Sequence, residues 1–172
     1  MIKSMVIGCS ALALMFAAHV QAAPAPQGPT ADFVTKAAQT DEFERREGRL
    51  AETHAHSPAV KKFGSEMVAA HTQTTKALKS AIRRAHLAPP PKPDLTPDQS
   101  QMLAQIDSLH GDAFDKAYID QQVKAHEDAL GVMQDYATNG APGPIQAAAK
   151  KTVPIVQHHL DMAKDIQSHI GG

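Results

Sequence analysis

Four ionisable residues stand near the middle of four predicted helices: Glu44, His71, His126 and His159. Each lies on a line of side chains that recur every three or four positions, so it shares the inward face of its helix. Three imidazoles and one carboxylate form a ligand set that zinc, copper, nickel and iron all accept. The pattern therefore predicts a site for one divalent transition metal. The alternative is a hydrogen-bonded polar layer without metal.

The four residues also lie at one height when the predicted turns serve as reference points. The glutamate lies 13 residues before Ser57 and the first histidine 14 after it, so both are roughly 20 Å from that turn. The other two histidines lie 14 residues before Gly140 and 15 after Pro144, which is roughly 21–23 Å from the second turn. The two pairs therefore meet in one layer, whichever way the hairpins are joined.

A carboxylate-bridged di-iron centre does not fit this pattern. Such centres need a Glu from each of two helices and a Glu-x-x-His from each of the other two. Valine stands three residues before each of the three histidines, at Val68, Val123 and Val156. Three methionines lie within a turn or two of the histidines: Met67, Met133 and Met162. Methionine suits copper(I), but at helical spacing it is more often a core residue.

Four long helices must position these side chains, and their ends carry recognisable signals. Thr30 is a good N-cap for a helix over residues 31–55, and Ser57 followed by Pro58 starts a second helix that runs to about residue 86. Asn139 and Gly140 end a third helix over residues 112–138, and the fourth covers residues 144–169. Pro154 lies inside the fourth helix and predicts a kink there.

The connections predict how the helices are arranged. Residues 87–96 contain four prolines and cannot be helical, whereas Thr96 and Gln99 form a capping box for a short helix to about residue 109. Two tight hairpins and this long segment predict an all-α, ferritin-like four-helix bundle with a long crossover, containing a short helix, between its second and third long helices. An up-and-down bundle with a loose linker is the alternative.

The ends and the composition limit the cellular context. Residues 1–22 resemble a secretory signal peptide with Val20 and Ala22 before the cleavage point, residues 23–30 a flexible leader, and residues 31–169 the bundle domain. Cleavage removes the only cysteine, and it removes Lys3, which leaves 16 of 17 basic residues against 18 acidic ones. The composition argues against a nucleic-acid surface, and no membrane-spanning segment follows the signal. We therefore expect a periplasmic or secreted protein.

Several stretches together resemble one known family of secreted bacterial proteins. They are 44–51 (ERREGRLA), 57–63 (SPAVKKF), 67–71 (MVAAH), 114–126 (FDKAYIDQQVKAH) and 153–160 (VPIVQHHL). On these residues the chain is similar to the ferritin-like family called domain of unknown function 4142. The resemblance implies an exported helical bundle with no established activity. The family's motif positions correspond here to Glu44, His71, Phe114, Asp115, Tyr118, His126 and His159.

The chain departs from this family at two positions, and its sequence is compatible with more than one class of function. Ala70 and Ala125 stand before the first two histidines, where the family often has Asp and where an acid could support a metal ligand. Our leading hypothesis is an exported bundle of undefined, non-enzymatic role, linked to envelope stress or metal handling. The alternatives are a metal-dependent redox enzyme using the four ionisable residues, and a protein-interaction module. The sequence names no protein partner.

Overall fold

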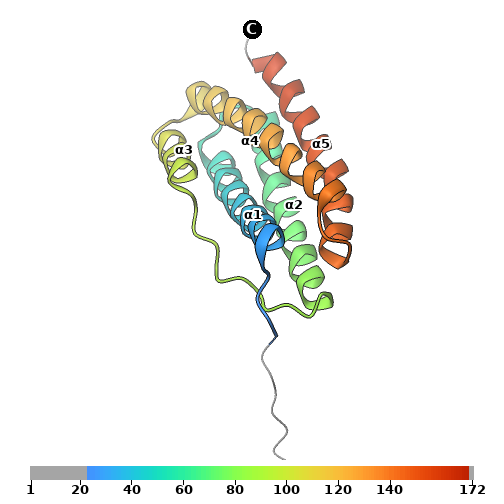
Figure 1. Cartoon of the computed structure of the whole chain (residues 1–172). Coiled ribbons are helices and arrows are strands. Elements are labelled where there is room, and N and C mark those ends of the chain that lie inside the picture. Colours follow the sequence, from blue (N-terminus) through green and yellow to red (C-terminus); the bar gives the residue numbers. More distant parts are fainter. Residues whose placement is uncertain (1–22, 171–172) are drawn as a thin grey trace, which may run out of the picture.

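Five helices account for most of residues 23–170, the part of the chain that the structure, a computed structural model, describes. The signal peptide expected over residues 1–22 lies outside these described residues. The helices are α1 (Gly28–His54), α2 (Pro58–Arg84), α3 (Pro97–Asp107), α4 (Gly111–Asn139) and α5 (Pro144–Ile170) (Figure 1). The described chain is therefore all-α, with four long helices and one short one, as predicted.

The helix boundaries follow the chain's prolines more closely than its polar caps. Pro58 and Pro144 each open a helix, and Thr96 forms the predicted capping box with Gln99 at the start of α3. The predicted N-cap Thr30 is wrong, because α1 already begins at Gly28, with a proline in its first turn. The α5 helix is continuous through Pro154.

The long helices form two hairpins that lie side by side. The α1 and α2 helices pack along each other, as do α4 and α5, while α2 contacts α5 and α1 contacts α4 less extensively. The segment between α2 and α4 climbs back along the bundle through α3, so α2 and α4 run in the same direction (Figure 1). Near its start, the backbone N–H of Ala88 donates to the carbonyl of Pro24 at 2.7 Å. Further along, the Gln39 side-chain amide of α1 donates to the carbonyl of Asp94 at 2.9 Å, so the segment follows the bundle as a crossover.

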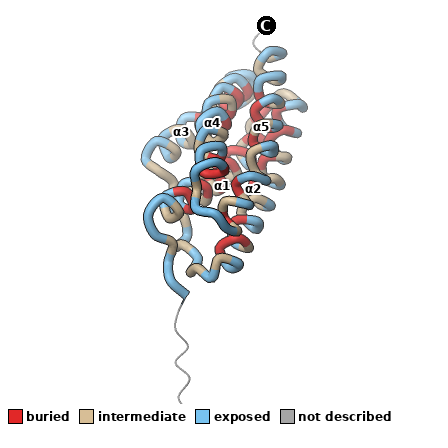
Figure 2. The backbone as a smooth tube through the Cα atoms, turned by 45° about the vertical axis from the view of Figure 1, so that its right-hand side comes forward, coloured by how far each residue is buried: buried red, intermediate tan, exposed pale blue. Residues whose placement is uncertain are grey.

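The core consists of two apolar clusters with a polar layer between them. One cluster includes Phe33, Ile82 and Tyr136, and the other includes Phe63 and Phe114. Figure 2 shows the buried residues along the inner faces of the four long helices. Eight polar or charged residues are buried with them: Asp41, Glu44, Glu47, His71, Asp115, Gln122, His126 and His159. Within residues 23–170, no helix is both long enough and apolar enough to cross a membrane.

Candidate metal centre

Three histidines from three helices converge in the polar layer. His71 of α2, His126 of α4 and His159 of α5 each offer a nitrogen, and no two of these atoms are more than 4.8 Å apart. Their ring centroids are separated by 5.5 to 5.9 Å. Two nitrogens that bind one zinc ion at about 2.1 Å must lie within about 4.2 Å of each other. Small side-chain rotations would therefore bring all three onto one ion.

The nitrogens that remain free are the ones suited to a metal. Nε2 of His71, Nε2 of His126 and Nδ1 of His159 are all buried and have no hydrogen-bond partner. A buried polar atom without a partner costs free energy, and such atoms are uncommon in native proteins. Three of them in one cluster are explained together by a shared ligand. The residue types and the geometry both fit a divalent transition metal.

His71 is oriented by a carboxylate from α1. Its Nδ1 donates to Oδ1 of Asp41 at 2.9 Å, and Asp41 also accepts hydrogen bonds from the hydroxyls of Thr74 (2.6 Å) and Thr75 (2.8 Å). Burial lowers the pKa of His71, but the hydrogen bond to Asp41 and the charges of Glu44 and Asp41 outweigh it, so the pKa is raised. This carboxylate–histidine pair is the arrangement that supports metal-binding histidines in many proteins.

Asp41 was not among the sequence-predicted residues. It is 6% exposed and lies three residues before Glu44, on the same side of α1. Its position three residues from an inward-facing glutamate was the available sequence signal. The acids absent at Ala70 and Ala125 are thus not the only source of support for the histidines, because α1 supplies one to His71.

His126 and His159 are held differently. Nδ1 of His126 donates to the backbone carbonyl of Gln122, one turn earlier, at 2.9 Å. Burial lowers the pKa of His126, and the charge of His71 acts in the same direction. The pKa of His159 is lowered to about 3 by burial and by the charges of His71, His126 and His158. Both rings therefore stay neutral at physiological pH, which leaves their nitrogens available as ligands.

Glu44 lies beside the histidine cluster but outside the group whose atoms fall within 4.8 Å of one another. Its Oε2 accepts from the Gln122 side-chain amide at 2.7 Å, and the same amide donates to Oε2 of Glu47 at 2.7 Å. The structure thus brings together His71, His126 and His159 and leaves Glu44 facing Gln122. Its charge nevertheless acts on the cluster, because it helps to raise the pKa of His71 and opposes the lowering of the pKa of His126.

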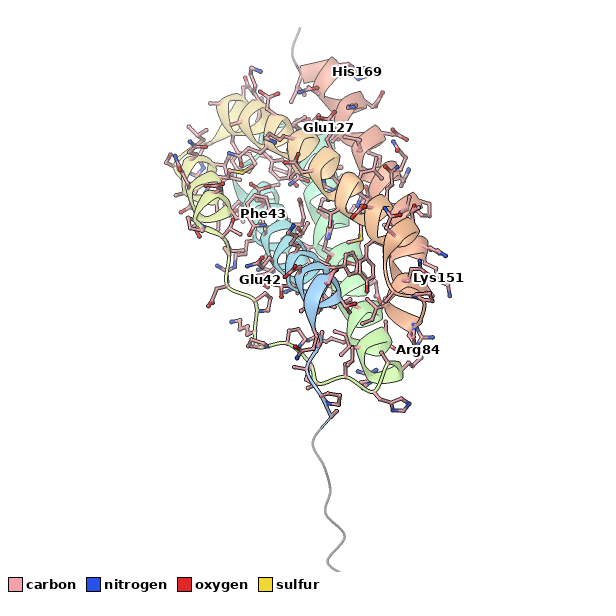
Figure 3. The ribbon with its side chains drawn as sticks, in the orientation of Figure 1. Glu42, Phe43, Arg84, Glu127, Lys151 and His169 are labelled. Atoms are coloured by element: carbon pink, nitrogen blue, oxygen red, sulfur yellow. The ribbon has the colours of Figure 1, made fainter. Side chains whose placement is uncertain are left out.

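The remaining motif residues have structural positions. Asp115 accepts hydrogen bonds from the backbone N–H groups of His56 (3.1 Å) and Ser57 (2.7 Å), so it ties the α1–α2 turn to α4. Phe114 and Tyr118 are fully buried and stack with ring centroids 5.5 Å apart. Histidines at helix ends lie away from the layer, as His169 near the end of α5 does (Figure 3).

The methionines near the histidines belong to the apolar core. Met133 is buried in the cluster that contains Tyr136, and Met67 is buried in the cluster that contains Phe63. Met162 is partly buried and packs against that second cluster. These positions agree with the interpretation of the methionines as core residues.

Comparisons with known proteins identify a family and a solved structure of similar fold, and neither names an activity. The model of the family "Domain of unknown function (DUF4142)" matches residues 16–166. The crystal structure of a candidate secreted protein of the DUF305 type from Streptomyces coelicolor is similar, with a TM-score of 0.69 at 10% identity. This likeness covers 83% of this chain and 92% of that chain. No curated protein matches the sequence.

Proposed function

The chain belongs to the DUF4142 family, and on this premise we propose that it is an exported helical bundle that binds one divalent transition-metal ion. His71, His126 and His159 are the proposed ligands. One observation carries the proposal: the three buried histidines each offer a nitrogen within 4.8 Å of the others, and each ring has a buried nitrogen without a hydrogen-bond partner. We assign the bundle a ferritin-like connectivity, on the basis of its long crossover, with the ion at mid-height.

Metal handling outside the cytoplasm, without catalysis, is the role that we propose for this site. The signal-peptide-like segment at residues 1–22 supports export to the periplasm or the medium. A structural neighbour is a candidate secreted protein. Three imidazoles suit zinc, copper, nickel or iron. We propose that Glu44 offsets the charge of the bound ion, because its carboxylate already acts on two of the three histidines.

Metal analysis of the mature protein, purified without a His-tag, tests this proposal. We expect one Co²⁺ or Zn²⁺ per chain, and we expect His126→Ala to abolish binding. His158→Ala is the matched control, because its ring lies next to His159 but outside the cluster. Equal loss in both variants, or no stoichiometric metal in the unaltered protein, would contradict the assignment. Asp41→Asn should retain the ligands and weaken binding about 10- to 100-fold.

Metal-dependent redox catalysis is the second candidate function. It is favoured by the number of ligands, because three protein ligands leave a coordination position for water or substrate, as in catalytic metal sites. A closed storage or structural site would instead use four. If the metal-loaded protein turns over small redox substrates, and His126→Ala does not, this second reading replaces the first. Binding without turnover supports the non-catalytic role.

A further inference from the structure

His159 differs from the other two histidines in how it is held. His71 and His126 are each fixed through Nδ1, by Asp41 and by the Gln122 carbonyl respectively, with both hydrogen bonds at 2.9 Å. Among the described residues, neither ring nitrogen of His159 has a hydrogen-bond partner, and only its Nδ1 is fully buried. Nδ1 is therefore enclosed by the protein, whereas Nε2 is accessible. Of the three rings, His159 is the one that can turn without breaking a hydrogen bond.

A surface pocket lies directly outside His159. It has a volume of about 660 Å³ and is lined by side chains of α2 and α5, including Glu66, Ala69, His158, His159 and Met162. Four other pockets in the described region have no histidine of the cluster in their lining. His159 thus has one edge in the buried centre and the other in this pocket.

The pocket also contains a group that attracts a cation. Glu66 has one carboxylate oxygen, Oε2, that is buried without a partner, and the other is 3.6 Å from Nζ of Lys62. This carboxylate lies in the same pocket as His159. The positive charge of Lys62 opposes it, but Lys62 is paired with Glu66 and mostly exposed, so solvent screens its charge.

The backbone of α5 is weakened on one side of His159. Pro154 has no N–H, so the carbonyl of Lys150 lacks its usual helical donor. Pro154, where the donor is missing, lies about 1.4 turns before His159. Helices bend more easily where such a bond is missing, so the part of α5 that carries His159 can shift at lower cost than in an uninterrupted helix.

We propose that a divalent cation reaches and leaves the centre through the pocket between α2 and α5, with His159 as the ligand that swings outward to admit it. This inference rests on the proposed function and makes it more specific. It assigns a site that exchanges its metal with the surroundings, as a carrier or buffer must. Asp41 and the Gln122 carbonyl keep the other two ligands in place during exchange.

Stopped-flow kinetics with Co²⁺ test this inference, because its absorption spectrum reports imidazole coordination. The mature protein would be mixed with Co²⁺ for association and the loaded protein with EDTA for release. Ala69→Phe fills the pocket at an exposed position, and Met162→Ala widens it. Ala77→Phe is the matched control, because Ala77 is an exposed alanine of α2 that lines a different pocket against α5.

We expect Ala69→Phe to slow association and release together by about tenfold, so that the Kd stays unchanged. Met162→Ala should accelerate both steps, and Ala77→Phe should behave like the unaltered protein. Exchange rates within about twofold of one another in all four proteins would overturn the inference and leave the metal site standing. Equal slowing by Ala69→Phe and Ala77→Phe would also overturn it. An unaltered protein that binds no Co²⁺ would instead refute the proposed function.

Discussion

At the scale of single residues, two buried glutamates share one amide next to the histidines. Glu44 and Glu47 are 1% and 0% exposed, and both accept from the Gln122 amide. Neither has an ion-pair partner within residues 23–170, and each keeps one buried oxygen without a hydrogen bond. Two buried carboxylates cannot both ionise cheaply. Burial and the charge of Glu44 accordingly raise the pKa of Glu47 well above its ordinary value of 4.5.

This raised pKa makes the stability of the fold depend on pH. Folded Glu47 binds a proton more tightly than unfolded Glu47, so its contribution is fully present below about pH 4.5 and is lost as the pH rises through the folded pKa. Glu47→Gln keeps an oxygen that can accept from Gln122 and removes the charge. We expect it to raise the free energy of unfolding by about 1–2 kcal/mol near pH 8, and less near pH 5.

Urea denaturation at several pH values of the metal-free protein would measure the effect. Asp32→Asn is the control, because Asp32 is an exposed acid on the same helix. If both variants raise the free energy of unfolding by the same amount, the cause is the change in net charge and not the buried pair of Glu44 and Glu47. A loss of stability in Glu47→Gln at every pH would contradict the account.

Residue spacing predicts which side chains of the candidate site share a layer, but it does not predict their hydrogen-bond partners. Helical periodicity and the distances to the turns were enough to bring His71, His126 and His159 into one layer. The partner of each ring was not predictable, because the Asp41–His71 bond depends on how α1 is rotated against α2. Glu44 lies on the predicted face, but the Gln122 amide decides where its carboxylate points.

At the scale of helices, two glycines set how closely α1 and α2 approach. A Cβ atom placed on Gly64 would lie 2.5 Å from Cβ of Ala51 and 2.8 Å from the carbonyl of Gly48, inside normal contact distance. A Cβ on Gly48 would lie 2.6 Å from the carbonyl of Gly64. Both contacts are to backbone or to a short side chain, so nothing can move aside cheaply. The close approach keeps Asp41 within hydrogen-bonding distance of His71.

Adding a methyl group at this contact should separate the two helices. We expect Gly64→Ala to lower the free energy of unfolding by about 1–3 kcal/mol, because the gain in helix propensity is smaller than the cost of overpacking. Gly131→Ala is the matched control, since a Cβ there meets nothing within 4 Å. It should stabilise the protein by about 0.5–1 kcal/mol. Denaturant unfolding measures both, and the same sign in the two variants would rule out the packing explanation.

The number and order of the helices were predictable because prolines, capping residues and hydrophobic spacing all indicate the same helical segments. Pro58, Pro144 and the Thr96 capping box each start a helix, as expected. The start of α1 was missed because Thr30 is used elsewhere. Its hydroxyl forms a 2.9 Å hydrogen bond with the Tyr136 hydroxyl of α4, a contact between residues 106 positions apart that no local pattern reveals.

At the scale of the whole molecule, the proposed ion would join two separately packed halves. His71 belongs to the α1–α2 hairpin, whereas His126 and His159 belong to the α4–α5 hairpin. Packing is extensive within each hairpin and thinner between them, where α2 meets α5 and α1 meets α4. Covalent connection between the hairpins runs only through the crossover. A shared metal would therefore act as a cross-link at mid-height, between the two apolar clusters.

Metal binding should consequently stabilise both hairpins together. An ion that binds only the folded state contributes about 2.7 kcal/mol at 100 times its Kd, which corresponds to a Tm increase of about 5–10 °C for a domain of this size. Amide hydrogen exchange should slow in α2 as well as in α4 and α5, because the ligands come from all three helices. His126→Ala should show neither effect at the same Co²⁺ or Zn²⁺ concentration, since it leaves one ligand in each hairpin. Protection confined to α5 would mean that the ion binds at the surface near His158 and His159 and does not cross-link the bundle.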